Sequence, residues 1–254
     1  MTTNGNDLIY GTMTSKTIDG RGGTDTVWYD RVTGNVALDV ADSGTFVYKS
    51  NGTFDTLLNI EAVSGSASQN DFVLGLGSSR GLTIDLKFGS LQVDGTSRRL
   101  SVTRFEHMIG SHYNDRLTGT DGNNWMNGSS GGDVLTGRAG ADTFSYDNWT
   151  DSYVSSTQYY VPGGTIDIIT DFQSGIDKID LRCVAQTTGR PSVWVGDRSG
   201  WGQGAWAIGT GQVGLIGNRV VANLGNNNLL QIDIFNTGST FASRPNVQWY
   251  DVLL

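Results

Sequence analysis

The sequence predicts an all-β fold, a parallel β-roll or β-helix of nonapeptide repeats with a β-rich cap at its C-terminal end. The main observation is a nine-residue register that runs unbroken from Gly110 to Ser145. It follows the G-G-x-G-x-D-x-U-x pattern, which is typical of calcium-binding parallel β-helices. Composition supports this fold, because 36 glycines and only 3 prolines suit many tight turns. No long amphipathic helical pattern occurs in the sequence.

Each position of the repeat has a physical role. The first position holds Gly110, Gly119, Gly128 and Gly137, the sixth holds Asp115, Asn124, Asp133 and Asp142, and the eighth holds Leu117, Met126, Leu135 and Phe144. Glycines allow a tight loop with positive φ, the sixth residue supplies a hard oxygen, and the eighth points a short strand into a core. Two nonapeptides form one coil, so loops separated by one intervening repeat stack roughly 4.7–4.9 Å apart. A calcium ion between stacked loops can take oxygens from both.

The register continues towards the N-terminus in a degenerate form. Asp7, Lys16 and Asp25 fall at the acidic position. Asp7 and Asp25 can share a site, since one full coil separates them, whereas Lys16 makes its own loop non-binding. Between the two blocks lies a longer duplication, in which residues 38–40 are echoed by residues 84–86 and residues 59–66 by residues 104–111. We interpret the duplicated units as coils with longer excursions, which repeat proteins tolerate on one face.

The pattern changes near Asp147, which divides the chain into two expected domains. Residues 1–146 are expected to form the calcium-binding roll, and residues 147–254 a β-rich capping region. Residues 147–164 are polar and irregular, and strand-like alternation then begins at Ile166. A cap is expected because an open coil end would expose apolar core and strand edges.

Composition argues against several classes of function. The net charge is −8 and no run of Lys or Arg stands out, which argues against nucleic acid or an anionic membrane as partner. No apolar stretch approaches the roughly 18 residues that a transmembrane helix needs, and no hydrophobic signal is expected at the N-terminus. The single cysteine, Cys183, cannot form an internal disulfide and is expected to be a small core residue.

Three segments give the chain a specific resemblance. Residues 137–144 form a complete last repeat, residues 167–181 continue with alternating apolar and acidic residues, and residues 251–254 combine one acidic with three apolar side chains. In these segments the chain resembles the C-terminal half of serralysin-type secreted metalloproteases and their relatives in the RTX family. The resemblance implies a right-handed β-roll, several bound Ca²⁺ ions and export by bacterial type I secretion machinery through a C-terminal signal. It therefore implies a secreted, extracellular protein whose residues 147–254 include the secretion signal.

The resemblance also implies a set of calcium ligands. In the family, sixth-position aspartates, a glutamate before the first repeat and aspartates after the last one coordinate through side chains, and loop glycines coordinate through backbone carbonyls. On this sequence the candidate ligands are Asp7, Asp25, Glu61, Asp71, Glu106, Asp115, Asn124, Gly128, Asp133, Gly137, Asp142, Asp167 and Asp177. The alternative role for the aspartates is to cap tight turns through Asx hydrogen bonds. Tyr113, Ser129 and Arg138 depart from the family by replacing loop glycines.

The sequence favours a secreted calcium-binding protein that folds on binding calcium and acts in extracellular binding or matrix association. It contains no His-Glu-x-x-His or other catalytic motif, so binding is favoured over catalysis. Two alternatives stay open. One is a polysaccharide lyase or epimerase with an active site on the roll surface, for which Tyr159, Tyr160 and the two histidines are the candidates. The other is a detached targeting domain of a secreted protease.

Histidines and tryptophans offer two further interpretations. His107 and His112 could hold zinc, but their separation of five residues on β-coils favours loop or surface positions. Trp194, Trp201 and Trp206 could stack on the sugar rings of an extracellular polysaccharide or cell surface. Packing that caps the open coil end is the favoured role for these tryptophans.

Overall fold

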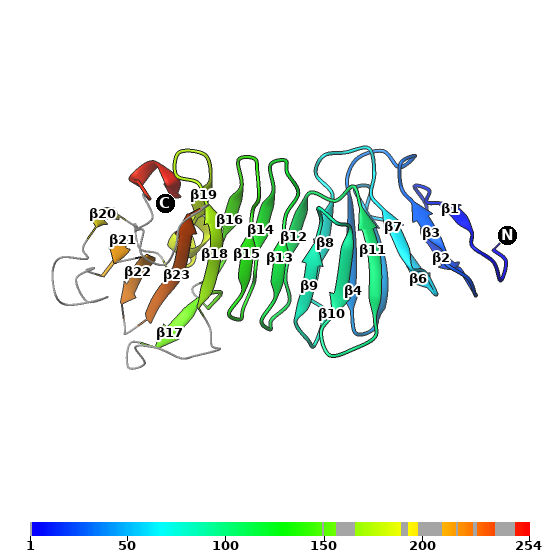
Figure 1. The fold of residues 1–254 in the computed structure, drawn as a ribbon, viewed down its shortest axis with the longest axis horizontal. Coiled ribbons are helices and arrows are strands. Elements are labelled where there is room, and N and C mark those ends of the chain that lie inside the picture. The colour runs from blue at the N-terminus through cyan, green and yellow to red at the C-terminus, as the bar shows by residue number, and fades with distance from the viewer. Residues whose placement is uncertain are drawn as a thin grey trace.

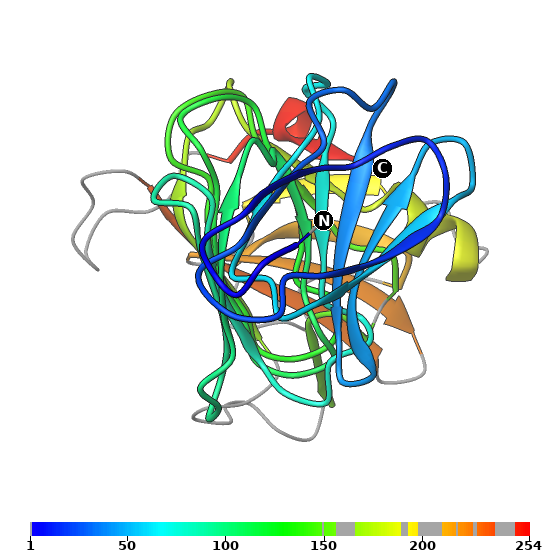
Figure 2. The same cartoon turned by 90° about the vertical axis from the view of Figure 1, so that its right-hand side faces the viewer.

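The chain winds into an elongated roll in which two β-sheets face one another across a shared core (Figure 1). This computed structural model describes residues 2–148, 150–155, 166–188, 193–197, 210–216, 218–225, 228–236 and 247–254. Seen from its N-terminal end, the roll shows successive turns of the chain behind one another as a flattened coil (Figure 2).

Two sheets contain all the described strands. Sheet A consists, in spatial order, of β1 (Leu8–Tyr10), β3 (Thr26–Trp28), β7 (Ala62–Ser64), β11 (Arg99–Thr103), β10 (Ser90–Val93), β9 (Leu82–Asp85), β13 (Arg116–Thr118), β15 (Val134–Thr136), β18 (Asp167–Phe172), β23 (Asn228–Asn236), β22 (Arg219–Gly225), β21 (Gln212–Ile216) and β20 (Val193–Asp197), with β17 (Tyr153–Ser155) paired to β23. Sheet B consists of β2 (Lys16–Asp19), β6 (Phe54–Leu58), β5 (Gly44–Lys49), β4 (Val36–Ala41), β8 (Phe72–Leu74), β12 (His107–Ile109), β14 (Trp125–Asn127), β16 (Thr143–Ser145), β19 (Lys178–Asp180) and β24 (Val252–Leu253).

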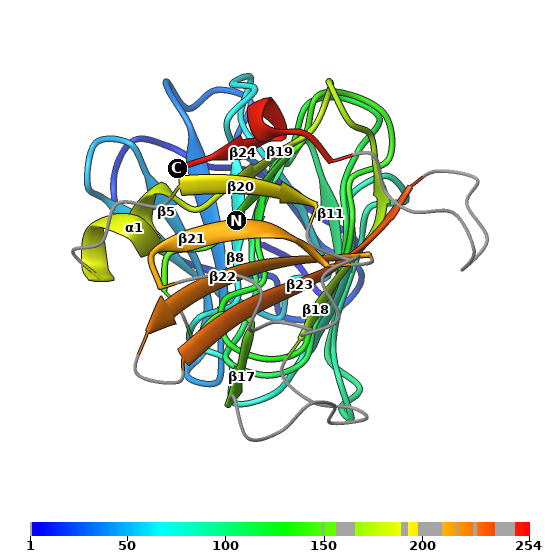
Figure 3. The ribbon, with the colours of Figure 1, turned by 90° about the vertical axis from the view of Figure 1, so that its left-hand side faces the viewer.

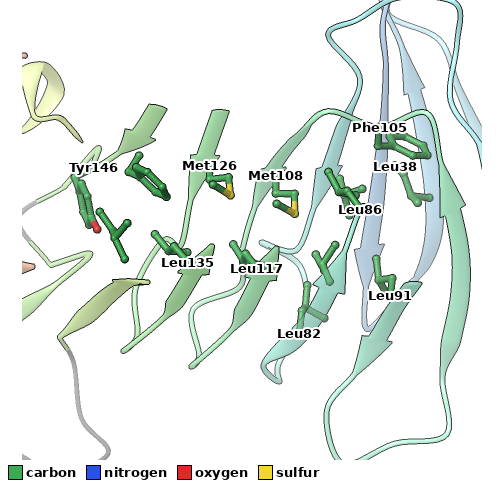
Figure 4. Packing of buried hydrophobic residues seen from close by; sticks show 14 of the residues in the cluster. Leu38, Leu82, Leu86, Leu91, Phe105, Met108, Leu117, Met126, Leu135 and Tyr146 are labelled. Atoms are coloured by element: carbon green, nitrogen blue, oxygen red, sulfur yellow. The ribbon is translucent and has the colours of Figure 1, made fainter. Parts of the chain in front are cut away.

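Strands one coil apart pair in parallel and keep the repeats in register. Leu117 on β13 pairs with Leu135 on β15, and Met126 on β14 pairs with Phe144 on β16. All four eighth-position side chains are fully buried, and Figure 4 shows Leu117, Met126 and Leu135 between the two sheets. Each stabilises the fold by about 1.5–3 kcal/mol relative to an exposed side chain. The predicted parallel β-roll with two nonapeptides in each coil is therefore confirmed.

Each unit of the sequence duplication forms a three-stranded antiparallel excursion. The first unit forms β4, β5 and β6 in sheet B, and the second forms β9, β10 and β11 in sheet A. The copies share local geometry, since Asn59 and Arg104 both adopt a positive φ, of 49° and 61°. Arg98, between β10 and β11, ties the excursions together by donating to the carbonyls of Ala41 (2.7 Å) and Gly44 (2.9 Å). The excursions widen the sheets without interrupting the coil.

Both sheets continue without a break past residue 146. β18 pairs with β15 and β19 pairs with β16, both in parallel, so they add a further coil to the roll. Sheet A then extends through β23, β22, β21 and β20, which cross the end of the roll (Figure 3). Val220, Ile232 and Ile234 of these strands join the same core cluster as the roll, which is how a cap buries an open coil end. The division into domains 1–146 and 147–254 stays a prediction.

The C-terminal residues form the last described strand of sheet B. Val252 of β24 pairs with Ile179 of β19. Asp251, in the short 3₁₀ helix η3 (Trp249–Asp251), is fully buried. Its carboxylate accepts the Ser174 hydroxyl at 2.7 Å and the Gly175 N–H at 2.8 Å. The segment is therefore packed into the roll, although it lies far from the repeats in sequence.

Helical structure is slight in the part of the chain that the structure describes. It contains one α-helix, α1 (Arg182–Thr188), which follows β19. Cys183 lies exposed on this helix, so the expectation of a small core residue is wrong. The neighbouring Val184 is buried instead, because adjacent residues of a helix point in different directions. None of the described helices is long and apolar enough to cross a membrane.

Candidate calcium sites

The predicted side-chain ligands share one structural position, the end of a loop at which a strand of the roll begins. Those at strands of sheet A are Asp7, Asp25, Glu61, Asp115, Asp133 and Asp167. Those at strands of sheet B are Asp71, Glu106, Asn124, Asp142 and Asp177. Because the chain alternates between the sheets, the candidates form two lines on opposite edges of the roll, which we call line A and line B.

Hydrogen bonds connect the members of each line from coil to coil. The backbone N–H groups of Asp115 and Asp133 donate to Oδ1 of Asp133 and Asp167, at 2.8 and 2.9 Å. The same bond joins Asp7 to Asp25, Asp25 to Glu61, Asp71 to Glu106, Asn124 to Asp142 and Asp142 to Asp177. Linked residues are 18 positions apart between Asp115 and Asp133 but 34 apart between Asp133 and Asp167. The number of residues between one coil and the next therefore differs along the roll.

A tight loop backbone occurs in three of the described loops. In each of these loops the residues at the second and fourth positions both have positive φ. The φ values are 71° at Arg21 and 115° at Gly23 in the first loop, and 67° at Ser129 and 143° at Gly131 in the second. In the third loop they are 77° at Arg138 and 115° at Gly140. These loops end at Asp25, Asp133 and Asp142, whose Oδ2 atoms are buried and have no hydrogen-bond partner. Oδ2 of Asp167, which follows Asp133 in line A, is in the same state. A buried carboxylate oxygen without a partner is costly, and a bound cation would remove that cost.

Other loops are closed by a serine or threonine at the second position. Ser111 donates its backbone N–H (2.6 Å) and its hydroxyl (3.0 Å) to Asp115, and its hydroxyl accepts the N–H of Tyr113 (3.1 Å). Equivalent bonds join Ser66 to Asp71 and Thr120 to Asn124. In these loops the side-chain oxygens of Asp71, Asp115 and Asn124 already have partners, as in the turn-capping role. That Asp71, Asp115 and Asn124 bind calcium stays a prediction.

Burial and mutual repulsion make the aspartates with an unpartnered Oδ2 strong candidates for cation binding. Burial is the main cause that raises the pKa of Asp133, and the negative charges of Asp167 and Asp115 raise this pKa further. Burial, reinforced by the charge of Asp177, raises the pKa of Asp142 to about 7. Burial also raises the pKa of Asp167 well above its usual range. These residues fit calcium, a hard cation that takes six to eight oxygen ligands, since a divalent charge would favour their ionised forms.

Gly128 and Gly137, the predicted backbone ligands, lie where no side chain would fit, and that their carbonyls bind calcium stays a prediction. A Cβ at either position would overlap Oδ2 of the sixth-position aspartate in its own loop, so glycine is required there. Their carbonyl oxygens lie beside Gly110 and Gly119, the first-position glycines of the preceding coil. Within the described residues, no three side chains of His, Cys, Asp or Glu form a group that could hold a metal. A bound calcium ion would therefore combine carboxylate oxygens with backbone carbonyls.

Sequence analysis missed one member of line B, Asp55. Its Oδ1 accepts the N–H of Lys16 at 2.9 Å, which is the bond that Asp133 makes with Asp115. The fully buried Lys49 ammonium lies 2.6 Å from the same oxygen. No repeat signal marks Asp55, because it lies inside strand β6 of the first excursion.

The histidines do not come together. His107 accepts the N–H of Trp125 at Nδ1 (3.0 Å), and His112 Nδ1 lies 3.3 Å from Oγ of Ser129. The remaining candidates, Tyr159, Tyr160, Trp201 and Trp206, lie outside the described residues. Trp194 is partly buried against the core cluster, in keeping with its expected role in packing.

Comparison with known proteins agrees with this geometry. No curated protein matches the chain. The family described as peptidase M10 serralysin C terminal matches residues 4–207 of the 254. This is a family of RTX β-rolls associated with calcium binding and type I secretion, so the resemblance inferred from the sequence is confirmed. Because the match covers most of its residues, the chain belongs to the serralysin C-terminal family of peptidase M10.

Proposed function

We propose that the chain is a secreted calcium-binding β-roll that folds when it binds calcium and then acts in extracellular binding or matrix association. The observation that carries this proposal is that four of the predicted ligands, Asp25, Asp133, Asp142 and Asp167, each have a buried Oδ2 without a hydrogen-bond partner. They lie where a loop of the roll meets a strand, at the positions where the repeat motif and the family resemblance predict calcium.

Charge repulsion explains why folding would depend on the ion. Asp115, Asp133 and Asp167 follow one another along line A with roughly one strand spacing, about 4.7–4.9 Å, between coils, and none is more than 2% exposed. Buried like charges at this distance repel, and loss of hydration adds to the cost. Calcium offsets both effects, and extracellular modules bind it at about 10⁻⁴–10⁻³ M. The coils that carry these carboxylates would stay unfolded where calcium is scarce, which suits export, and would fold outside the cell.

Circular dichroism and calorimetry test this coupling directly. The purified chain should show a much weaker β spectrum in chelator, and millimolar calcium should strengthen it and release heat from the binding of several ions. Magnesium at the same concentration is the control, because it demands a smaller octahedral site and should not replace calcium. A β spectrum that is identical in chelator and in calcium would overturn the proposal.

The outer face of sheet B supports a binding role. The ring centroid of Phe72 lies 4.9 Å from that of His107 and 5.9 Å from that of Trp125, on neighbouring strands. Tyr48 and Phe54, on β5 and β6, are exposed and their ring centroids are 5.7 Å apart. Aromatic side chains are enriched in binding surfaces. An extracellular polysaccharide or a cell surface is therefore the proposed ligand.

A glycan array, probed with and without calcium, tests the proposed ligand. Binding should require calcium, because the aromatic face exists only in the folded roll. A Trp125→Ala variant that still shows the calcium-induced β spectrum should bind less. Retention of full glycan binding by this variant would contradict the assignment of the surface.

Export by the type I route is the proposed path out of the cell. Coexpression with and without a type I exporter tests it, since the chain should reach the medium only when the exporter is present. The lyase or epimerase alternative gains no support from the two histidines, since His107 contacts Trp125 at the start of β14 and His112 contacts Ser129 in the loop that follows β14. A detached targeting domain would differ from the proposal by binding a secreted protease.

A further inference from the structure

Lys49 places a buried positive charge inside line B. Its ammonium donates to Oδ1 of Asp55 and to the carbonyl of Thr14, both at 2.6 Å. The side chains of Lys49 and Asp55 are both completely buried. A buried lysine is rare unless it is paired, and here both of its partners are oxygens.

The two oxygens belong to stacked coils, as do the oxygens of the candidate calcium sites, and the Asp55 carboxylate has a direct counterpart there. Thr14 occupies the fourth position of the loop that begins at Gly11, and Lys16 occupies the sixth position. Asp55 accepts the N–H of Lys16 from the next coil, as the acidic members of each line do. The Lys49 ammonium therefore lies between the loop of Gly11 and strand β6, where it donates to a loop carbonyl and to the carboxylate of the adjoining coil.

The carboxylate of Asp55 differs from the unpartnered ones in having every oxygen engaged. Lys16 and Lys49 donate to Oδ1, and the Tyr29 hydroxyl donates to Oδ2 at 2.9 Å. The ring of Tyr29 fills the space next to Gly11, where a Cβ would overlap it. At Gly128 and Gly137 the sixth-position carboxylate fills this space, but the loop of Gly11 has Lys16 at its sixth position.

We propose that the Lys49 ammonium is the resident cation of a site built like the calcium sites, so that this level of the roll needs no calcium to fold. The ammonium supplies a covalently attached positive charge where the other loops require a divalent ion. The position is also a latent divalent-cation site, which removal of the lysine would open. Breaking a buried ion pair leaves an uncompensated charge, which is strongly destabilising.

Backbone hydrogen exchange of the full chain tests the assignment. In chelator, the amides of β5 and β6 in the wild-type chain should remain protected, and calcium should change their exchange little. In Lys49→Met, whose unbranched side chain is one atom shorter and carries no charge, these amides should exchange on the order of 100-fold faster in chelator. Calcium should restore their protection in this variant.

The double variant Lys49→Met/Asp55→Asn is the matched control. It removes both charges, so its β5 and β6 amides should be protected with or without calcium. If the β5 and β6 amides of Lys49→Met were as well protected in chelator as those of the wild type, the assignment would be overturned. So would a Lys49→Met variant that calcium does not restore while the double variant folds. If calcium protected no segment of the wild-type chain, the proposed function would fail, and the chelator comparison of the two variants would still test Lys49.

Discussion

The backbone N–H of Asp115 donates to Oδ1 of Asp133 at 2.8 Å, and the second carboxylate oxygen of Asp133 has no partner. The two oxygens of Asp133 therefore differ in role. Oδ1 fixes the spacing between two coils, and Oδ2 is left for a cation. Asp25 and Asp142 have the same arrangement, each accepting an N–H from the preceding coil through Oδ1.

Asp133→Asn should weaken calcium binding by about tenfold or more, because the site loses a charged ligand. In chelator the same variant should be more stable than the wild type, since it no longer buries an ionised group without a partner. Asn124 shows that an amide fits this position, because its Nδ2 donates to the Glu106 carbonyl at 2.6 Å. Calcium titration by calorimetry and urea unfolding in chelator measure the two effects.

Asp71→Asn is the matched control for this prediction. Asp71 accepts the N–H of Val36 at 2.7 Å and both the N–H and the hydroxyl of Ser66, so an amide group there would face donors. We expect a loss of about 1.5–3 kcal/mol with and without calcium and a smaller change in calcium affinity than in Asp133→Asn. Equal losses of affinity in the two variants would show that the unpartnered oxygen does not mark the site.

Acid should stabilise the calcium-free chain. Burial raises the pKa of Asp142 from 3.8 to about 7, and burial raises that of Asp115 to about 6. A raised carboxyl pKa favours the neutral form in the folded state, so its contribution to stability is complete below the unfolded value and is lost as pH rises through the folded value. In chelator, the unfolding temperature should therefore fall from about pH 4 to about pH 7.

Calcium should reverse this trend, because protons compete with the ion for the same carboxylates. Asp142→Asn should flatten the pH dependence in chelator, since the variant cannot titrate at this position. A wild-type unfolding temperature that rises with pH in chelator would contradict the prediction.

Arg138→Gly should stabilise the chain by about 1 kcal/mol, because Arg138 holds a left-handed backbone that glycine adopts freely. Its φ is 77°. Ser111→Gly, at the same repeat position, should destabilise the chain instead, since it removes the hydroxyl that donates to Asp115. Urea unfolding in saturating calcium compares the two variants, and a change of the same sign in both would refute the distinction between the loops.

Asp251→Ala should destabilise the last coil by about 2–3 kcal/mol, because the buried carboxylate accepts the Gly175 N–H and the Ser174 hydroxyl. Leu254→Ala, at an exposed side chain, is the control and should have little effect. Thermal unfolding in calcium measures both. An unchanged unfolding temperature in Asp251→Ala would show that the terminal segment contributes nothing to the roll.

The sequence by itself determined the fold and the positions of the candidate ligands. Leu117 and Leu135, and likewise Asp115 and Asp133, are separated by one coil of the repeat. A period of this kind can be read from a sequence, because every repeat must bury its own apolar residue and close its own loop. Family membership follows from the same residues, as the match over residues 4–207 confirms.

Only the tertiary structure decided which carboxylates are left without partners. Ser111 and Ser129 are the same residue type at the same repeat position, yet Ser129 has a φ of 67° and Ser111 instead binds Asp115. Whether the serine binds the aspartate or adopts a positive φ depends on the whole loop and on the coil against which the loop packs. The fourth position is Tyr113 in the loop of Ser111 and Gly131 in the loop of Ser129.

The pairing of Lys49 was also decided by the tertiary structure. Lys49 and Thr14 are 35 residues apart in the chain, and no repeat relates them. They meet because the first excursion folds β5 and β6 back beside the first coil, with β6 paired to β2. The periodic pattern specifies interactions that recur at every coil, whereas a contact made once, through an irregular excursion, depends on long-range packing.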